Sequence, residues 1–176
     1  MRWWHKILPD GRWRLLQLRW ISLTIVLACS SCSDNWKPQE LADYLAPISD
    51  ADKVTLYSID GKDPEGSKPS NKGAEKFHGT PVLGTIEIKD SQIREQLVQA
   101  LLKNMQVEGK AIPACFIPRH GIRAEKSGKT TDYVICFECY QVEVYRNTMR
   151  YKLQVERQPQ ELLNRLLKEG NIPIAP

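Results

Sequence analysis

The chain has 176 residues, of which 25 are Lys or Arg and 21 are Asp or Glu, so its formal net charge at pH 7 is +4. Five of the bases but only one of the acids precede Cys29, which leaves 20 of each sign in the remainder. Because phosphate recognition requires a basic footprint, this balance argues against a nucleic-acid-binding protein. The remainder, about 145 residues long, has the length of one domain with a genuine core and not of two.

The N-terminus is a positively charged segment followed by a short apolar run. Against the single acid Asp10 stand five bases: Arg2, Lys6, Arg12, Arg14 and Arg19. Such a segment prefers the cytoplasmic side of a membrane. The run I-S-L-T-I-V-L-A at 21–28 fits the roughly 7 to 15 residues of a signal-peptide core and falls short of the roughly 20 that span a bilayer. We predict an export signal over residues 1–28 and no permanent transmembrane helix.

Small residues and two cysteines end this run, in the order V-L-A-C-S-S-C at 26–32. The sequence resembles the bacterial lipobox, in which a cysteine thiol receives diacylglycerol and becomes the new N-terminus. The resemblance implies that Cys29 carries the lipid, with Cys32 as the alternative. An ordinary signal peptide cut after Ala28, which leaves a soluble periplasmic protein, is a third possibility.

This signal predicts the cellular location of the protein. We expect a lipoprotein of the bacterial cell envelope, on the periplasmic or extracytoplasmic face, with the membrane as its partner through the lipid. Ser30 follows Cys29 and Ser33 follows Cys32, so neither cysteine precedes an aspartate. In a Gram-negative cell this pattern resembles sorting to the outer membrane.

The first half of the exported part alternates between helix and strand signals. Pro38 and an apolar face at 41, 44 and 45 predict a short helix that ends at Pro47, so we assign residues 29–52 to an anchor, a tether and this helix. The domain proper is predicted at 53–176. Its first strands are expected at 53–59 and 82–89, where β-branched and aromatic residues gather. Residues 61–81, rich in Gly, Pro, Lys and Ser, predict a long flexible loop.

The second half predicts more strands between two helices. Asp90 or Ser91 caps a helix with an apolar stripe that ends at Met105, and a last helix runs from Pro159 to Gly170. Between them, extended chain is expected at 111–117, 121–125, 130–145 and 149–155, with a turn at 126–129. The predicted fold class is α+β, a single domain with a mainly antiparallel sheet of about five strands and two or three helices packed on it.

Two arms of the predicted hairpin carry conspicuous motifs. One arm contains P-R-H-G-I-R at 118–123 and the other contains I-C-F-E-C at 135–139. Together they resemble a recurrent pattern of uncharacterised bacterial secreted proteins, in which an arm ending P-R-H-G-I-R is followed by an I-C-F-x-C strand. The resemblance covers residues 80–145 and implies no known activity.

The same arms hold the only candidate metal ligands: Cys115, His120, Cys136 and Cys139. Three cysteines and one histidine can complete a tetrahedral zinc site. However, residues three apart on a flat strand point to opposite faces, so Cys136 and Cys139 could share a metal only across a bulge.

Two other readings of the cysteines stay open. If Ser127-Gly128 centres the turn, the numbers of paired residues sum to about 255, which allows a disulfide from Cys115 to Cys136 or Cys139 in the oxidising envelope. Alternatively, the cysteines are small core residues and His120 makes a local hydrogen bond.

No catalytic residue is predicted. A Cys-His nucleophile would need an oxyanion site that the sequence does not supply, and the C-x-x-C pair lies in a strand instead of at a helix N-terminus. Arg119 and Arg123 could clamp an anion, but Glu125 and Glu138 lie close enough in the hairpin to pair with them. We therefore predict a lipid-anchored envelope protein with a non-catalytic binding or structural role and no cofactor. The alternatives are a zinc-binding module and an envelope enzyme, and the sequence names no protein or small-molecule partner.

Overall fold

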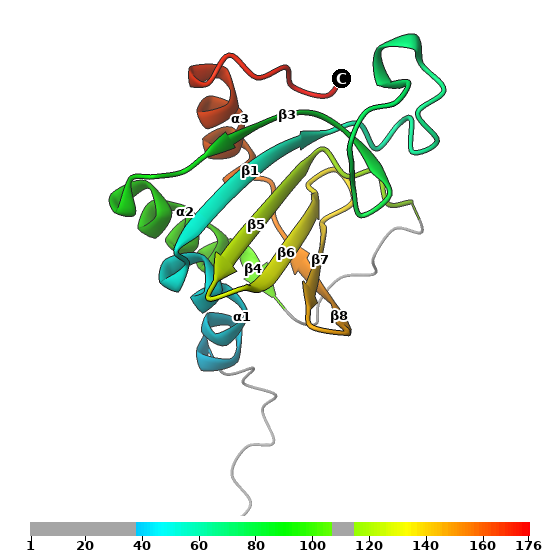
Figure 1. Cartoon of the computed structure of the whole chain (residues 1–176). Helices are drawn as coiled ribbons and strands as arrows, with labels where there is room; N and C mark the ends of the chain where they lie inside the picture. Colours follow the sequence, from blue (N-terminus) through cyan, green and yellow to red (C-terminus); the bar gives the residue numbers. More distant parts are fainter. Residues whose placement is uncertain (1–37, 107–114) are drawn as a thin grey trace, which may run out of the picture. The chain divides into compact units, whose positions relative to one another are not determined.

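A computed structural model describes residues 38–106 and 115–176, which belong to one compact unit (Figure 1). The predicted export signal and both candidate lipidation sites, Cys29 and Cys32, lie outside the described residues. Three helices and eight strands are found in the described part. In chain order the elements are α1 (Pro38–Asp50), β1 (Lys53–Ile59), the short 3₁₀ helix η1 (Pro69–Asn71), β2 (Lys76–Phe77), β3 (Thr80–Glu87), α2 (Ser91–Asn104), β4 (Met105–Gln106), β5 (His120–Lys126), β6 (Lys129–Cys136), β7 (Gln141–Arg146), β8 (Met149–Val155) and α3 (Pro159–Glu169).

The predicted α+β class is confirmed, whereas the predicted number of about five strands is wrong. Eight strands form one sheet in the order β2-β3-β1-β5-β6-β7-β8-β4, and the pairings between them are antiparallel. Two of the additional strands, β2 and β4, have only two residues each. The other difference lies at 130–145, where a tight turn divides the stretch into β6 and β7.

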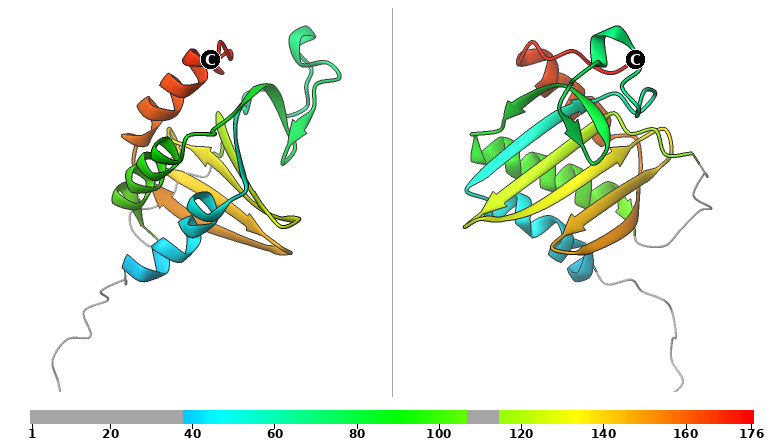
Figure 2. Two further views of the ribbon diagram at one scale, coloured as in Figure 1. Left: turned by 60° about the vertical axis from the view of Figure 1, so that its left-hand side comes forward. Right: turned by 45° about the vertical axis from the view of Figure 1, so that its right-hand side comes forward.

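All three helices lie along one face of the curved sheet (Figure 2). Alternate residues of β1, β5, β6, β7 and β8 point to this face and meet the apolar side of each helix. Fully buried side chains at this interface include Leu45 and Ile48 of α1, Leu97 of α2, and Leu163 and Leu167 of α3. Burying each such side chain contributes about 1.5–3 kcal/mol, so the helix-covered face is the main core.

Helix α1 is longer than its sequence predicts. Pro47 lies inside it, and the helix continues to Asp50. Proline in a helix interior removes one backbone hydrogen bond, but Ile48 is fully buried against the sheet and the packing of its side chain favours helical backbone there. Helix α1 therefore contributes to the core of the domain.

The other two helices begin and end where their sequences predict. Asp90 caps α2, because its carboxylate accepts hydrogen bonds from the backbone N–H groups of Gln92 at 2.7 Å and Ile93 at 3.4 Å. Pro159 opens α3 and Gly170 ends it, donating its N–H to the carbonyl of Leu166 at 3.1 Å. No described helix is both long enough and apolar enough to cross a membrane.

The segment between β1 and β3 packs against one end of the opposite face of the sheet (Figure 2). Phe77 from this segment stacks on Tyr57 of β1 with ring centroids 4.3 Å apart, and both belong to a second apolar cluster with Ile59 and Val134. Gly121 of β5 permits this contact, since a Cβ atom there would lie 2.6 Å from the Phe77 ring. The loop predicted at 61–81 thus packs on the sheet through Phe77.

Candidate functional site

The P-R-H-G-I-R and I-C-F-E-C motifs meet at one end of the β5–β6 hairpin. The backbone N–H of Arg119 donates to the carbonyl of Ile135 at 3.2 Å, and its guanidinium lies 3.0 Å from a carboxylate oxygen of Glu138. His120 pairs with Ile135 in the register of the two strands, so the paired numbers sum to 255 as the sequence predicts. The contact between the two arms and the pairing of Arg119 with Glu138 are confirmed.

The cysteines are connected differently from the prediction. Cys136 and Cys139 form a disulfide with each other, and Cys115 is a free, exposed thiol. The alternative in which Cys115 is disulfide-bonded to either of them is therefore wrong for this structure. Sequence reasoning missed this bond because it placed both cysteines inside one continuous strand, whereas a turn follows Cys136 and brings Cys139 back beside it.

The four predicted zinc ligands are not gathered around one point. Two of the sulfurs are bonded to each other, the third cysteine is exposed, and the His120 ring contacts α3. Within residues 38–106 and 115–176, no group of three or more His, Cys, Asp or Glu side chains is arranged to hold a metal ion.

His120 is a buried histidine on the helix-facing side of β5. Its Nε2 atom lies 2.8 Å from Oδ1 of Asn164 on α3, so we assign the ring proton to Nε2. Burial lowers the pKa of His120 to about 4, although the hydrogen bond to Asn164 acts in the opposite direction. The imidazole is therefore neutral at ordinary pH.

Unsatisfied polar atoms cluster around this histidine. The Nδ1 atom of His120, the hydroxyl of Ser58 and the Nε atom of Arg119 are buried without a hydrogen-bond partner. Ser58 and His120 are direct cross-strand partners. Serine, histidine and asparagine are the residue types of a nucleophile, a base and an orienting group, but Ser58 is fully buried and a substrate does not reach it.

A hydrogen-bonded ion pair lies on the opposite face of the sheet. Arg123 makes a bidentate contact to Asp132 with both N–O distances 2.8 Å, and His78 approaches the same carboxylate at 2.8 Å. Burial opposes the ionisation of Asp132, but the hydrogen bonds from Arg123 and His78 outweigh it and hold its pKa below the usual range. The sequence predicts Glu125 or Glu138 as the partner of Arg123. The partner is instead Asp132, which is directly opposite Arg123 on β6.

This ion pair holds the segment between β1 and β3 against the sheet. The His78 ring stacks on Tyr145 with centroids 3.8 Å apart, and the guanidinium of Arg123 lies 5.3 Å from the centroid of the Phe77 ring. The cluster is consistent with a structural clamp, since its charges are paired with one another.

The segment between β1 and β3 also contains a hydrogen-bond network around two buried carboxylates. Asn71 donates to Asp60 at 3.0 Å and to Asp63 at 2.9 Å. The Ser67 hydroxyl donates to Asp63 at 2.7 Å and Lys68 forms an ion pair with Asp60. These carboxylates are occupied by donors of the protein.

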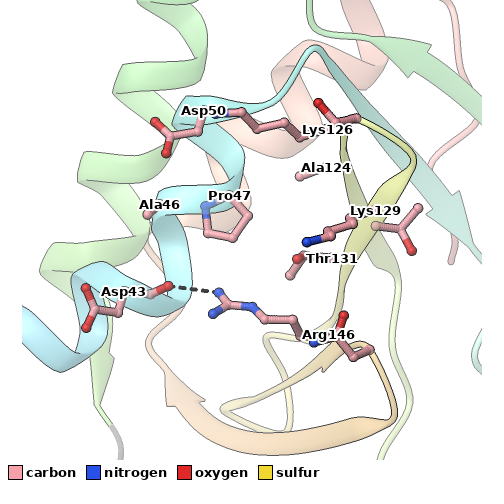
Figure 3. A pocket seen from close by; sticks show the side chains of 12 residues that line it. Asp43, Ala46, Pro47, Asp50, Ala124, Lys126, Lys129, Thr131 and Arg146 are labelled. Atoms are coloured by element: carbon pink, nitrogen blue, oxygen red, sulfur yellow. Dashed lines mark hydrogen bonds between the residues drawn. The ribbon is translucent and has the colours of Figure 1, made fainter.

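A third site is an open pocket of about 560 Å³ between α1 and the ends of the β5–β6 and β7–β8 hairpins (Figure 3). It is lined by Asp43, Ala46, Pro47, Asp50, Ala124, Lys126, Ser127, Lys129, Thr130, Thr131, Arg146 and Asn147. The side chains of Lys129 and Arg146 point into the pocket, whereas the carboxylates of Asp43 and Asp50 point away from it (Figure 3). The interior of the pocket is therefore positive.

The strand register explains why the positive charges gather there. Lys126 and Lys129 are directly opposite each other in the last pair of the hairpin, on the face that α1 covers. Arg146 pairs with Thr131 on the next strand and so shares that face. It donates to the backbone carbonyl of Asp43 at 2.8 Å, while its buried Nε atom has no partner. Like charges placed directly opposite each other in a sheet are destabilising, so this arrangement has a cost.

Sequence reasoning recognised the turn at 126–129 but not the pocket. The pairing of the two lysines follows from the hairpin register that the sequence predicts. The position of α1 above the hairpin, and the arrival of Arg146 from a strand that was not separately predicted, depend on tertiary packing.

Comparison with known proteins gives no match to a protein-family model, to a curated protein or to a solved structure.

Proposed function

We propose that this chain is a lipid-anchored protein of the bacterial cell envelope whose domain binds an anionic ligand in the pocket beneath α1. The role is one of binding and not of catalysis. Two features support the proposed location in the cell envelope. One is the lipobox-like sequence at 26–32, and the other is the disulfide between Cys136 and Cys139, a bond typical of exported proteins.

The main observation that supports an anion site is a pair of facing lysines, Lys126 and Lys129, whose charges no acidic side chain in the described part of the chain neutralises. Neither Lys126 nor Lys129 has an ion-pair partner among the described residues, although exposed acids are plentiful on this domain. The carboxylate of Asp52 accepts a hydrogen bond from the backbone N–H of Ser127 at 2.9 Å and so holds the turn in place. A ligand with negative charge would offset the repulsion between the lysines.

The chemistry of the lining narrows the class of ligand. Besides three cations, the lining includes Ser127 and Thr131, whose hydroxyl groups can donate to oxygen atoms. Phosphate and carboxylate groups accept several such charge-assisted bonds at once. We therefore assign the pocket to a small phosphorylated or carboxylated compound, or to such a group on a larger molecule.

The anchor would keep this pocket close to the membrane. Helix α1 begins at Pro38, nine residues after Cys29 and six after Cys32. An extended chain spans at most about 3.5 Å per residue, so the start of α1 lies no more than roughly 30 Å from the lipidated residue in either case. The proposed ligand is one that occurs near the membrane surface.

Lys129→Gln tests the anion site, with inorganic phosphate as the probe. At constant ionic strength we expect phosphate to raise the Tm of the wild-type protein, and we expect the variant to bind phosphate about tenfold more weakly in calorimetric titration. Without phosphate the variant should be more stable by about 0.2–1 kcal/mol, because the repulsion from Lys126 is removed. A lysine with a purely structural role would show the opposite sign.

Lys103→Gln is the matched control, since Lys103 is an exposed lysine at the end of α2 and outside the pocket. It should change neither the phosphate affinity nor the stability. If the wild type, Lys129→Gln and Lys103→Gln respond identically to phosphate, the pocket is not an anion site.

The anchor is tested separately by metabolic labelling with palmitate in cells that express the full chain. We expect label in the wild type and in Cys32→Ser, and complete loss of label in Cys29→Ser, because the thiol is the point of attachment. Loss in Cys32→Ser alone would move the anchor to the alternative cysteine. An unlabelled wild type would contradict the lipoprotein assignment and leave the anion site untouched.

A further inference from the structure

The disulfide is covered by the chain segment that carries the third cysteine. Cys136 and Cys139 are each about 1% exposed, whereas Cys115 is exposed. The backbone N–H of Ile117 donates to the sulfur of Cys139 at 3.4 Å. Residues 115–117 therefore lie against the disulfide, and this segment stands between Cys139 and solvent.

The thiol of Cys115 is within reach of that sulfur. Cys115 is two positions before Ile117, and a chain spans at most about 3.5 Å per residue, so the Cα atom of Cys115 lies within roughly 10 Å of the Cys139 sulfur. The Cα atoms of disulfide-bonded cysteines are typically about 5.5–6 Å apart. A local rearrangement of this exposed segment would bring the two sulfurs together.

The turn favours one of the two sulfurs as the leaving group. The backbone N–H of Cys139 donates to the sulfur of Cys136 at 3.1 Å. A hydrogen bond to a thiolate stabilises its charge, and a more stable thiolate leaves faster in exchange. Attack should thus occur at Cys139, with Cys136 released.

We propose that Cys115, Cys136 and Cys139 form a thiol–disulfide exchange site. Cys115 gives its proton to a solvent base, and its thiolate attacks the sulfur of Cys139. The Cys115–Cys139 bond forms as the Cys139–Cys136 bond breaks, and Cys136 leaves with the electron pair and takes a proton from solvent. One disulfide and one thiol are present before and after, so the step needs no oxidant or reductant. It uses none of the residues of the anion pocket.

Cys136→Ser in the full chain tests this exchange by removing the resident partner. After air oxidation, alkylation and peptide mapping, we expect most molecules to contain a Cys115–Cys139 disulfide. Cys139→Ser is the matched control, because it removes the attacked sulfur, and there both Cys115 and Cys136 should be free and become alkylated once the protein is unfolded. Free Cys115 and Cys139 in Cys136→Ser would overturn the proposal.

A measurement on the wild type covers the case in which a variant does not fold. The folded protein is held at pH 8, where free cysteine is partly ionised, and samples taken over time are quenched and alkylated with N-ethylmaleimide in acidic denaturant before peptide mapping. Exchange predicts that alkylated Cys136 appears together with a Cys115–Cys139 disulfide. Alkylation confined to Cys115, with the Cys136–Cys139 bond intact at every time point, would refute exchange in the native protein.

Discussion

Asp132→Ala is expected to lower the free energy of unfolding by about 2–3 kcal/mol. The Asp132 side chain is only 7% exposed and accepts hydrogen bonds from Arg123 and His78. Removing it leaves the guanidinium of Arg123, which is two-thirds buried, without its partner on the sheet. Urea denaturation monitored by circular dichroism measures the loss.

The same change should release the segment between β1 and β3. Limited proteolysis is therefore expected to cut this segment sooner in Asp132→Ala than in the wild type. Glu138→Gln provides the comparison, because Glu138 is 48% exposed in its pair with Arg119 and such pairs contribute less than about 1 kcal/mol. Equal stability losses in the two variants would show that the clamp is no stronger than a surface ion pair.

Acid should destabilise the domain through His120. The folded protein keeps this ring neutral down to about pH 4, whereas an ordinary histidine in the unfolded chain takes up its proton near pH 6.5. Between these values the unfolded state binds more protons, so stability is fully present above about pH 6.5 and falls as the pH is lowered. The loss reaches about 3 kcal/mol at pH 4.

His120→Gln removes the titrating ring and should flatten the dependence of the unfolding free energy on pH between 6.5 and 4. His78 is the other histidine among the described residues, and His78→Gln should retain the fall in the unfolding free energy. The measurement is a series of chemical denaturation curves at fixed ionic strength. A fall that persists unchanged in His120→Gln would assign the acid sensitivity to other groups.

The local features of the fold were predictable where one strong signal had no competitor. Asp90, Pro159 and Gly170 mark helix ends through backbone chemistry that tertiary contacts do not change. The turn at Ser127-Gly128 fixes the register of β5 and β6, and both residues have positive φ angles, 48° and 77°, as a tight hairpin requires. Pro47 misled the prediction, because the packing of Ile48 outweighs a lost hydrogen bond.

The candidate sites were less predictable because each depends on contacts between distant parts of the chain. The motif arms meet through the hairpin, so their contact could be foreseen. The partner of Cys136 could not, since it depends on a turn whose residues resemble a strand. The anion pocket requires α1 to lie over two hairpins, about 80 to 100 residues away in sequence, and no periodicity within either part indicates that placement.

The sheet ends on one side at β8, which β4 covers only at Gln154 and Val155 among the described residues. The rest of that edge carries Arg150 and Lys152, each about half exposed. Charged side chains on an open edge discourage another chain from adding its own strand. The proposed lipid anchor would confine molecules to a plane and raise their encounter rate, and under that proposal these two charges would help keep neighbouring copies from joining edge to edge.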